Sequence, residues 1–65
     1  MSKEEKLKKI DFIIDFYRSR NMNESVQKFQ FIKENNIENI NEDDLNDLHW
    51  LLKELETVRS ELAAS

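Results

Sequence analysis

Hydrophobic residues recur every three or four positions in the first third of the chain. The positions of this stripe are Leu7, Ile10, Ile14 and Tyr17. Such spacing places the side chains on one face of an α-helix. Ser2 and Glu5 form the S-x-x-E pattern of a capping box, which marks a helix start. The pattern therefore predicts a helix over residues 3–20.

The same period continues in two later segments. The second stripe consists of Val26, Phe29 and Ile32; the third consists of Leu45, Leu48, Leu52, Leu55 and Leu62, broadened by Leu51 and Val58. Each stripe predicts one amphipathic helix, the second over residues 24–35 and the third over residues 42–62. Residues 63–65 are expected to form a frayed tail.

Asparagines separate the three segments, and the chain contains neither glycine nor proline. Asn21 and Asn23 are favourable N-caps for the second helix, and Asn41 is one for the third. We expect Asn35 and Asn36 to close the second helix, because asparagine tolerates the left-handed conformation.

These segments predict an all-α fold, a small three-helix domain with two long helices and one short helix. We expect a single domain over residues 1–65, with the two long helices roughly antiparallel. A domain of this size buries only about 60% of its unfolded surface, so its stability margin is thin. Pairing as a helical homodimer would add to that stability.

The third segment begins with an acidic run that could suggest a metal site. Glu42, Asp43 and Asp44 lie in the first helical turn, where the helix dipole favours negative charge. An EF-hand loop would need a glycine, and the chain has none. His49 is the sole histidine, whereas a zinc site needs three or four ligands. We therefore expect no metal and no other cofactor.

No residues form a recognisable catalytic group. His49 has no cysteine partner, and the serines occupy expected caps, turns and chain ends. The chain lacks a glycine-rich phosphate loop, and a domain this small offers no obvious pocket for a small-molecule substrate. We therefore expect a protein that is not an enzyme.

Four of the six aromatic residues lie away from the hydrophobic stripe of their own helix. At 100° per residue, Phe12, Phe31 and Trp50 lie about 200° from the centre of their stripes, and Phe16 about 240°. Large exposed aromatics are unusual on a water-soluble protein, so something is expected to cover them. We interpret these four residues as a candidate protein-binding surface.

Three arrangements would bury these aromatic side chains. If the first helix is central and the other two helices pack on two of its sides, Phe12 and Phe16 belong to a core that surrounds it. A second copy of the chain, or a different protein, would instead cover them at an interface. Arg59 lies in the leucine stripe, where it could pair with Asp44 of an antiparallel second copy and set the register. Alternatively, Arg59 extends to solvent at a frayed helix end.

Charge is distributed unevenly, which suggests two alternative functions. The first helix carries the basic residues Lys3, Lys6, Lys8, Lys9, Arg18 and Arg20. These could contact a nucleic-acid backbone, although the net charge of −4 opposes such binding. The third helix carries Asp43, Asp47, Glu54 and Glu61 along one flank. Such a flank could mimic DNA and block a DNA-binding protein.

The favoured interpretation is a non-catalytic protein-binding module, a small regulator, inhibitor or assembly factor. Its partner would be another protein or a second copy of itself. No apolar run is long enough to cross a membrane, and no secretion signal is visible, so we expect a cytoplasmic location. The abundance of Asn, Ile and Lys favours an AT-rich genome, as in a phage or plasmid of a low-GC bacterium.

Overall fold

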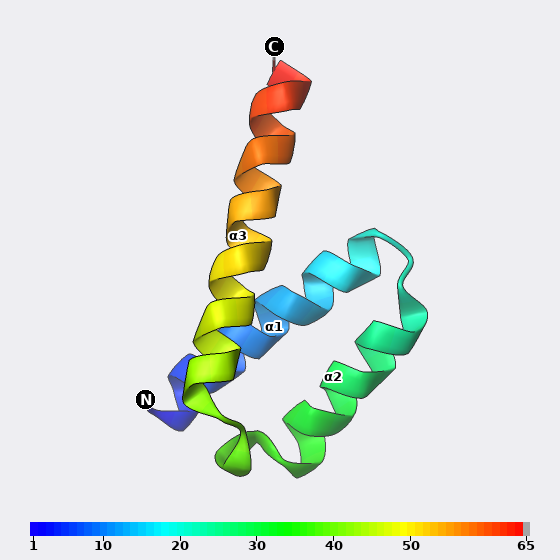
Figure 1. Cartoon of the computed structure of the whole chain (residues 1–65). Helices are drawn as coiled ribbons and strands as arrows, with labels where there is room; N and C mark the ends of the chain where they lie inside the picture. The colour runs from blue at the N-terminus through cyan, green and yellow to red at the C-terminus, as the bar shows by residue number, and fades with distance from the viewer. Residues whose placement is uncertain (65) are drawn as a thin grey trace.

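Three α-helices and one short 3₁₀ turn make up the computed structural model, which describes residues 1–64 (Figure 1). The elements are α1 (Lys3–Ser19), α2 (Asn23–Asn35), η1 (Ile37–Asn39) and α3 (Glu42–Ala64). This confirms the predicted all-α fold of two long helices and one short helix. The 3₁₀ turn was not predicted.

Side-chain caps define the starts of the two long helices. The hydroxyl of Ser2 accepts a hydrogen bond from the backbone N–H of Glu5 at 3.2 Å. The side-chain oxygen of Asn41 accepts one from the backbone N–H of Asp44 at 3.0 Å. Each bond satisfies an N–H that has no partner within its helix. The predicted caps at Ser2 and Asn41 are therefore confirmed.

Asn21 has a different role from the predicted one. It is the only non-glycine residue among residues 1–64 with a positive φ, 58°, and it ends α1 instead of starting α2. The N–H of Asn21 donates to the carbonyl of Arg18, and the N–H of Met22 donates to that of Tyr17. These two bonds form the Schellman motif that closes many helices. The prediction that Asn21 is an N-cap was therefore wrong.

The other two asparagine predictions also need correction. Asn23 is already the first residue of α2, and no side chain caps that helix. Asn36 ends α2 with a φ of −144°, so the left-handed conformation expected there is absent. The chain instead turns through η1, which brings Ile37 into the core.

α2 runs back antiparallel to α1, because the start of one helix meets the end of the other. Lys33 pairs with Asp11 at 2.6 Å, and the ring of Phe29 stacks on that of Tyr17 with centroids 5.6 Å apart. As the residue number rises in α2, the number of its partner in α1 falls. At 1.5 Å per residue, α2 is about 20 Å long, which nearly spans the length of α1.

α3 then runs in the same general direction as α1. Three contacts show this direction: Lys9 with Asn46, Phe12 with His49, and Arg20 with Glu56. The partner numbers rise together, so the prediction that the two long helices are antiparallel was wrong. Although α2 is the shortest α-helix, it carries the chain back to the start of α1 before α3 begins (Figure 1).

The core lies on two sides of α1. One cluster of buried residues contains Ile10, Ile14, Val26 and Ile37, and the other contains Ile13, Phe16, Leu45 and Leu52. Ile10 and Ile13 have no exposed surface. α1 therefore packs against α2 on one face and against α3 on another.

The last two turns of α3 extend beyond the other helices (Figure 1). α3 has 23 residues and α1 has 17, which corresponds to about 35 Å and 26 Å at 1.5 Å per residue. Every residue from 57 to 64 is exposed. The helix continues to Ala64 instead of ending at residue 62, and Ser65 of the predicted tail lies outside the described residues.

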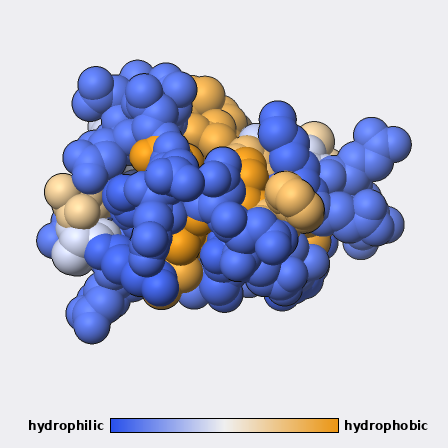
Figure 2. All heavy atoms as spheres, turned by 90° about the horizontal axis from the view of Figure 1, so that it is seen from below, coloured by the Kyte–Doolittle hydropathy of each residue, from blue (hydrophilic) through white to orange (hydrophobic). Residues whose placement is uncertain are grey.

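The end of the molecule near η1 is mostly hydrophilic, with hydrophobic side chains visible between the polar ones (Figure 2). Within residues 1–64, no helix combines the length and the apolar character needed to cross a membrane.

Candidate protein-binding surface

Two of the four aromatics assigned to the binding surface contribute to the contact between α1 and α3. Phe16 is buried, and its ring lies under the guanidinium of Arg20, 3.6 Å from the ring centre. Phe12 is partly buried, and its ring meets that of His49 edge-on at 5.1 Å. The central position of α1 therefore covers both phenylalanines within one chain. Neither of them belongs to an exposed surface.

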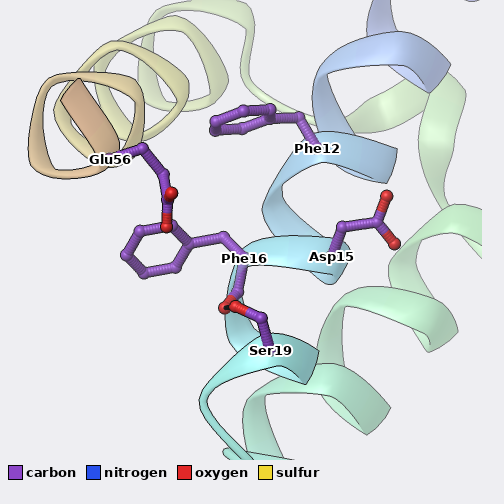
Figure 3. A pocket seen from close by; sticks show the side chains of 5 residues that line it. All are labelled: Phe12, Asp15, Phe16, Ser19 and Glu56. Carbon is purple, nitrogen blue, oxygen red and sulfur yellow. Dashed lines mark hydrogen bonds between the residues drawn. The ribbon is translucent and has the colours of Figure 1, made fainter. Parts of the chain in front are cut away.

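A small pocket opens between the rings of Phe12 and Phe16 on α1 and Glu56 on α3 (Figure 3). Asp15 and Ser19 complete its lining, and its volume is ≈ 220 Å³. Ligand sites usually have volumes of about 300–1,000 Å³. The carboxylate of Glu56 is also held 2.7 Å from Arg20. The pocket is therefore a poor candidate for a small-molecule site.

Phe31 and Trp50 remain exposed, as their positions on the two helices predicted. Phe31 on α2 retains 65% of its surface in contact with solvent, and Trp50 on α3 retains 64%. They lie on different helices, and each is outside both core clusters.

A second exposed apolar surface was not predicted. Leu51, Leu55 and Val58 are about half exposed, at 49%, 48% and 49%, and Leu62 is 71% exposed. Their spacing of four, three and four places them on one face of α3, within about 60° at 100° per residue. We call these four residues the α3 stripe.

The leucine pattern of the third segment did not distinguish covered from exposed positions, and the structure divides it into the two. Leu45 and Leu52 turn toward α1 and are buried, whereas the α3 stripe points about 100° away from them, so even Leu51, beside Leu52, is half exposed. The heptad spacing of these leucines fits an interface as well as a core, so the pattern alone did not identify the exposed part.

A groove between α2 and α3 extends the apolar surface toward η1. Its lining residues are Lys28, Phe29, Ile32, Ile40, Asp44, Leu45 and Leu48, and its volume is ≈ 260 Å³. Leu48 lies one helical turn before Leu51, so the groove meets the stripe. The combined surface therefore follows α3 along most of its length.

Charged residues border the α3 stripe on both sides. Asp47, Glu54 and Glu61 lie about 50–90° from the stripe centre on one edge, and Arg59 lies about 70° away on the other. None of these four side chains forms an ion pair with another residue in the described part of the chain. The stripe therefore has an acidic edge and an edge that carries Arg59.

The basic residues of α1 mostly contact other parts of the same chain. Lys6 is buried, and its ammonium donates to the carbonyl of Glu38 at 3.2 Å and lies 3.8 Å from the carboxylate of Glu42. The further contacts are Lys3 with Glu38, Lys9 with Asn46, Arg18 with Asp15, and Arg20 with Glu56. Of the six predicted nucleic-acid contacts, only Lys8 has neither a hydrogen bond nor an ion pair from its side chain within residues 1–64.

His49 lies beside the ring of Phe12 at the boundary of the core. Burial lowers the pKa of His49, and the positive charges of Lys9 and Lys53 lower it further. All three causes favour the neutral imidazole. Within residues 1–64, no group of three or more His, Cys, Asp or Glu side chains is arranged to hold a metal ion.

In comparisons with protein-family models, with curated proteins and with solved structures, the chain shows no significant match.

Proposed function

We propose that this chain is a non-catalytic protein-binding module, a small regulator, inhibitor or assembly factor. The observation that carries the proposal is the exposure of the α3 stripe together with Trp50. The stripe forms an apolar surface on one face of α3 and is bordered by charges, and Trp50 lies about 110° from its centre, beyond the acidic edge. Interfaces combine such an apolar centre with a polar rim.

Exposed aromatic residues further support a binding role. Trp and Tyr are the residues that most often dominate binding energy, and Trp50 stands on a well-anchored part of α3, next to Leu51. Phe31 lies on another helix and is a secondary candidate. Phe12 and Phe16 would support the fold instead of contacting a partner.

Two variants with the same added charge test this proposal in capture experiments from the native host. Leu55→Lys places an ammonium in the α3 stripe, and Ser60→Lys places one on the opposite face of the same helix. We expect Leu55→Lys to abolish capture and Ser60→Lys to leave it unchanged. Trp50→Ala should weaken binding by about 2 kcal/mol if this residue anchors the partner. Unchanged binding of both Leu55→Lys and Trp50→Ala, with normal folding, would refute the proposal.

The nucleic-acid alternative receives less support from the side-chain contacts. Lys6 and Arg20 contact groups of the same chain, which leaves fewer free cations on α1 for phosphates. The DNA-mimic alternative depends on Asp43, Asp47, Glu54 and Glu61, whose spacing gives about one charge per 6–10 Å of helix. Duplex DNA carries one charge per about 1.7 Å. A low-salt fluorescence-anisotropy titration against DNA and RNA tests the first alternative, and a salt-sensitive complex with a basic protein would support the second.

A further inference from the structure

We infer that the α3 stripe binds the α3 stripe of a second copy, with the two helices parallel. This inference rests on the proposed protein-binding function and identifies the partner. It starts from the spacing of the stripe. Leu48, Leu51, Leu55, Val58 and Leu62 occupy alternating a and d positions of a heptad repeat. A 3.5-residue period is the pattern by which two helices pair along their length.

The charges beside the stripe favour a second copy in parallel orientation. In this heptad, Asp47, Glu54 and Glu61 occupy the g positions, and Arg59 occupies an e position. In a parallel pair, a g residue faces the e residue five positions later in the partner. Glu54 would therefore face Arg59 of the second copy, twice by symmetry.

The antiparallel orientation would bring like charges together. In that arrangement, g positions face g positions, so the acidic edge defined by Asp47, Glu54 and Glu61 would meet its own copy. Like charges across an interface oppose association. The earlier prediction of an antiparallel pair through Arg59 and Asp44 is therefore replaced by a parallel one.

The groove between α2 and α3 has one basic and one acidic residue in its lining, Lys28 and Asp44. In the N-terminal half of α3, the e positions Leu45 and Leu52 are buried in the chain's own core. Lys28 of α2 borders the groove on this side. The parallel orientation therefore rests on the facing of Glu54 and Arg59, and the groove adds apolar surface next to Leu48.

Sedimentation equilibrium of the purified full chain tests whether a second copy covers the α3 stripe. We expect a dimer whose association constant falls by at least about a hundredfold in Leu55→Lys, because two leucines leave the interface together. Ser60→Lys should dimerise like the unaltered chain. Leu55 is already half exposed, so circular dichroism should show that both variants remain folded, with a loss of helix in Leu55→Lys limited to the projecting turns of α3.

Single cysteines test the parallel orientation, because the chain has no cysteine of its own. Leu51→Cys and Val58→Cys both occupy d positions, which face their own copies in a parallel pair. Both variants should form disulfide-linked dimers on oxidation, since the Cβ atoms would come within reach of a disulfide. Ser60→Cys, on the opposite face, should not. A dimer in which neither d-position cysteine links would overturn the parallel arrangement.

A charge exchange tests the pairing of Glu54 with Arg59. Arg59→Glu should weaken the dimer, and adding Glu54→Arg should restore it, because the double variant recreates an opposite-charge pair. A chain that is monomeric at all concentrations would overturn the second copy as partner. If that monomer still binds a host protein through the α3 stripe, the proposed function stands. If it binds none, both proposals fail.

Discussion

The guanidinium of Arg20 lies 3.6 Å from the centre of the Phe16 ring and pairs with Glu56 at 2.7 Å. It also donates to the carbonyl of Phe16 at 3.1 Å. One side chain at the end of α1 thus covers a core aromatic and joins α1 to α3. This arrangement explains why Phe16 is buried although it lies away from the main stripe of its helix.

The first prediction concerns this arginine. Arg20→Ala should lower the free energy of unfolding by about 1–2 kcal/mol, because it removes a cation–π contact and a partly buried ion pair. Arg18→Ala is the matched control. Arg18 is exposed, and its one ion pair within residues 1–64 is with the exposed Asp15, so its removal should cost less than about 0.5 kcal/mol. Urea unfolding measures both, and equal effects would contradict the bridging role of Arg20.

The second prediction compares a buried and an exposed phenylalanine, both of which lie away from the hydrophobic stripe of their own helix. Phe16→Ala should cost about 3–5 kcal/mol, because it leaves a cavity between α1 and α3. A domain of this length has only about 3–10 kcal/mol of total stability, so this variant should be largely unfolded. Phe31→Ala should change stability by less than about 0.5 kcal/mol, since Phe31 is mostly exposed. Circular dichroism and urea unfolding distinguish the two outcomes.

Local signals in the sequence predicted the helices and two of their caps well. Asn41 and Ser2 act within three residues of their partners, so the pattern alone contains the information. The placement of Phe16 could not be predicted in this way. It depends on which faces of α1 the other helices cover, and this follows from the direction in which α2 returns the chain.

The candidate surface, too, could be predicted from the sequence only in part. The exposure of Trp50 followed from its angle to the leucine stripe. The exposure of Leu55 and Val58 did not, because a leucine at a heptad position fits a core and an interface equally well. The direction from which α1 contacts α3 decides which leucines are covered: Leu52 faces α1 and is buried, whereas Leu51 beside it faces away and is half exposed.

The third prediction concerns the backbone at Asn21. Its φ of 58° is unfavourable for residues with a Cβ atom, by about 1–2 kcal/mol for most of them. Asn21→Gly should therefore preserve or raise stability, whereas Asn21→Ala should lower it by about 1 kcal/mol. Asn36→Gly serves as the control and should give no gain, because φ at Asn36 is −144°. A thermal melt of the three variants measures the order, and a gain at Asn36 alone would contradict it.

The fourth prediction concerns pH and His49. The pKa of His49 is lowered from its ordinary 6.5 by burial and by Lys9 and Lys53. The unfolded chain therefore binds a proton at a higher pH than the folded chain does. The stability contribution is complete above pH 6.5 and is lost as pH falls through the lowered pKa.

Urea unfolding between pH 7.5 and 5 measures this loss. His49→Gln has no titrating imidazole, so its stability should change less over the same range. An equal decline in both proteins would show that other groups, such as the carboxylates, cause the pH dependence.

The last prediction concerns the projecting end of α3. Residues 57–64 are all exposed, and an isolated helix of this length is marginal in water. At concentrations where the chain is monomeric, the amides of Val58 and Arg59 should exchange with solvent much faster than that of buried Leu52. At concentrations where two copies pair, the amides of the projecting turns should gain protection. Leu55→Lys should remove this concentration dependence. Hydrogen-exchange mass spectrometry at two concentrations measures both effects, and uniform slow exchange in a proven monomer would contradict the expected fraying.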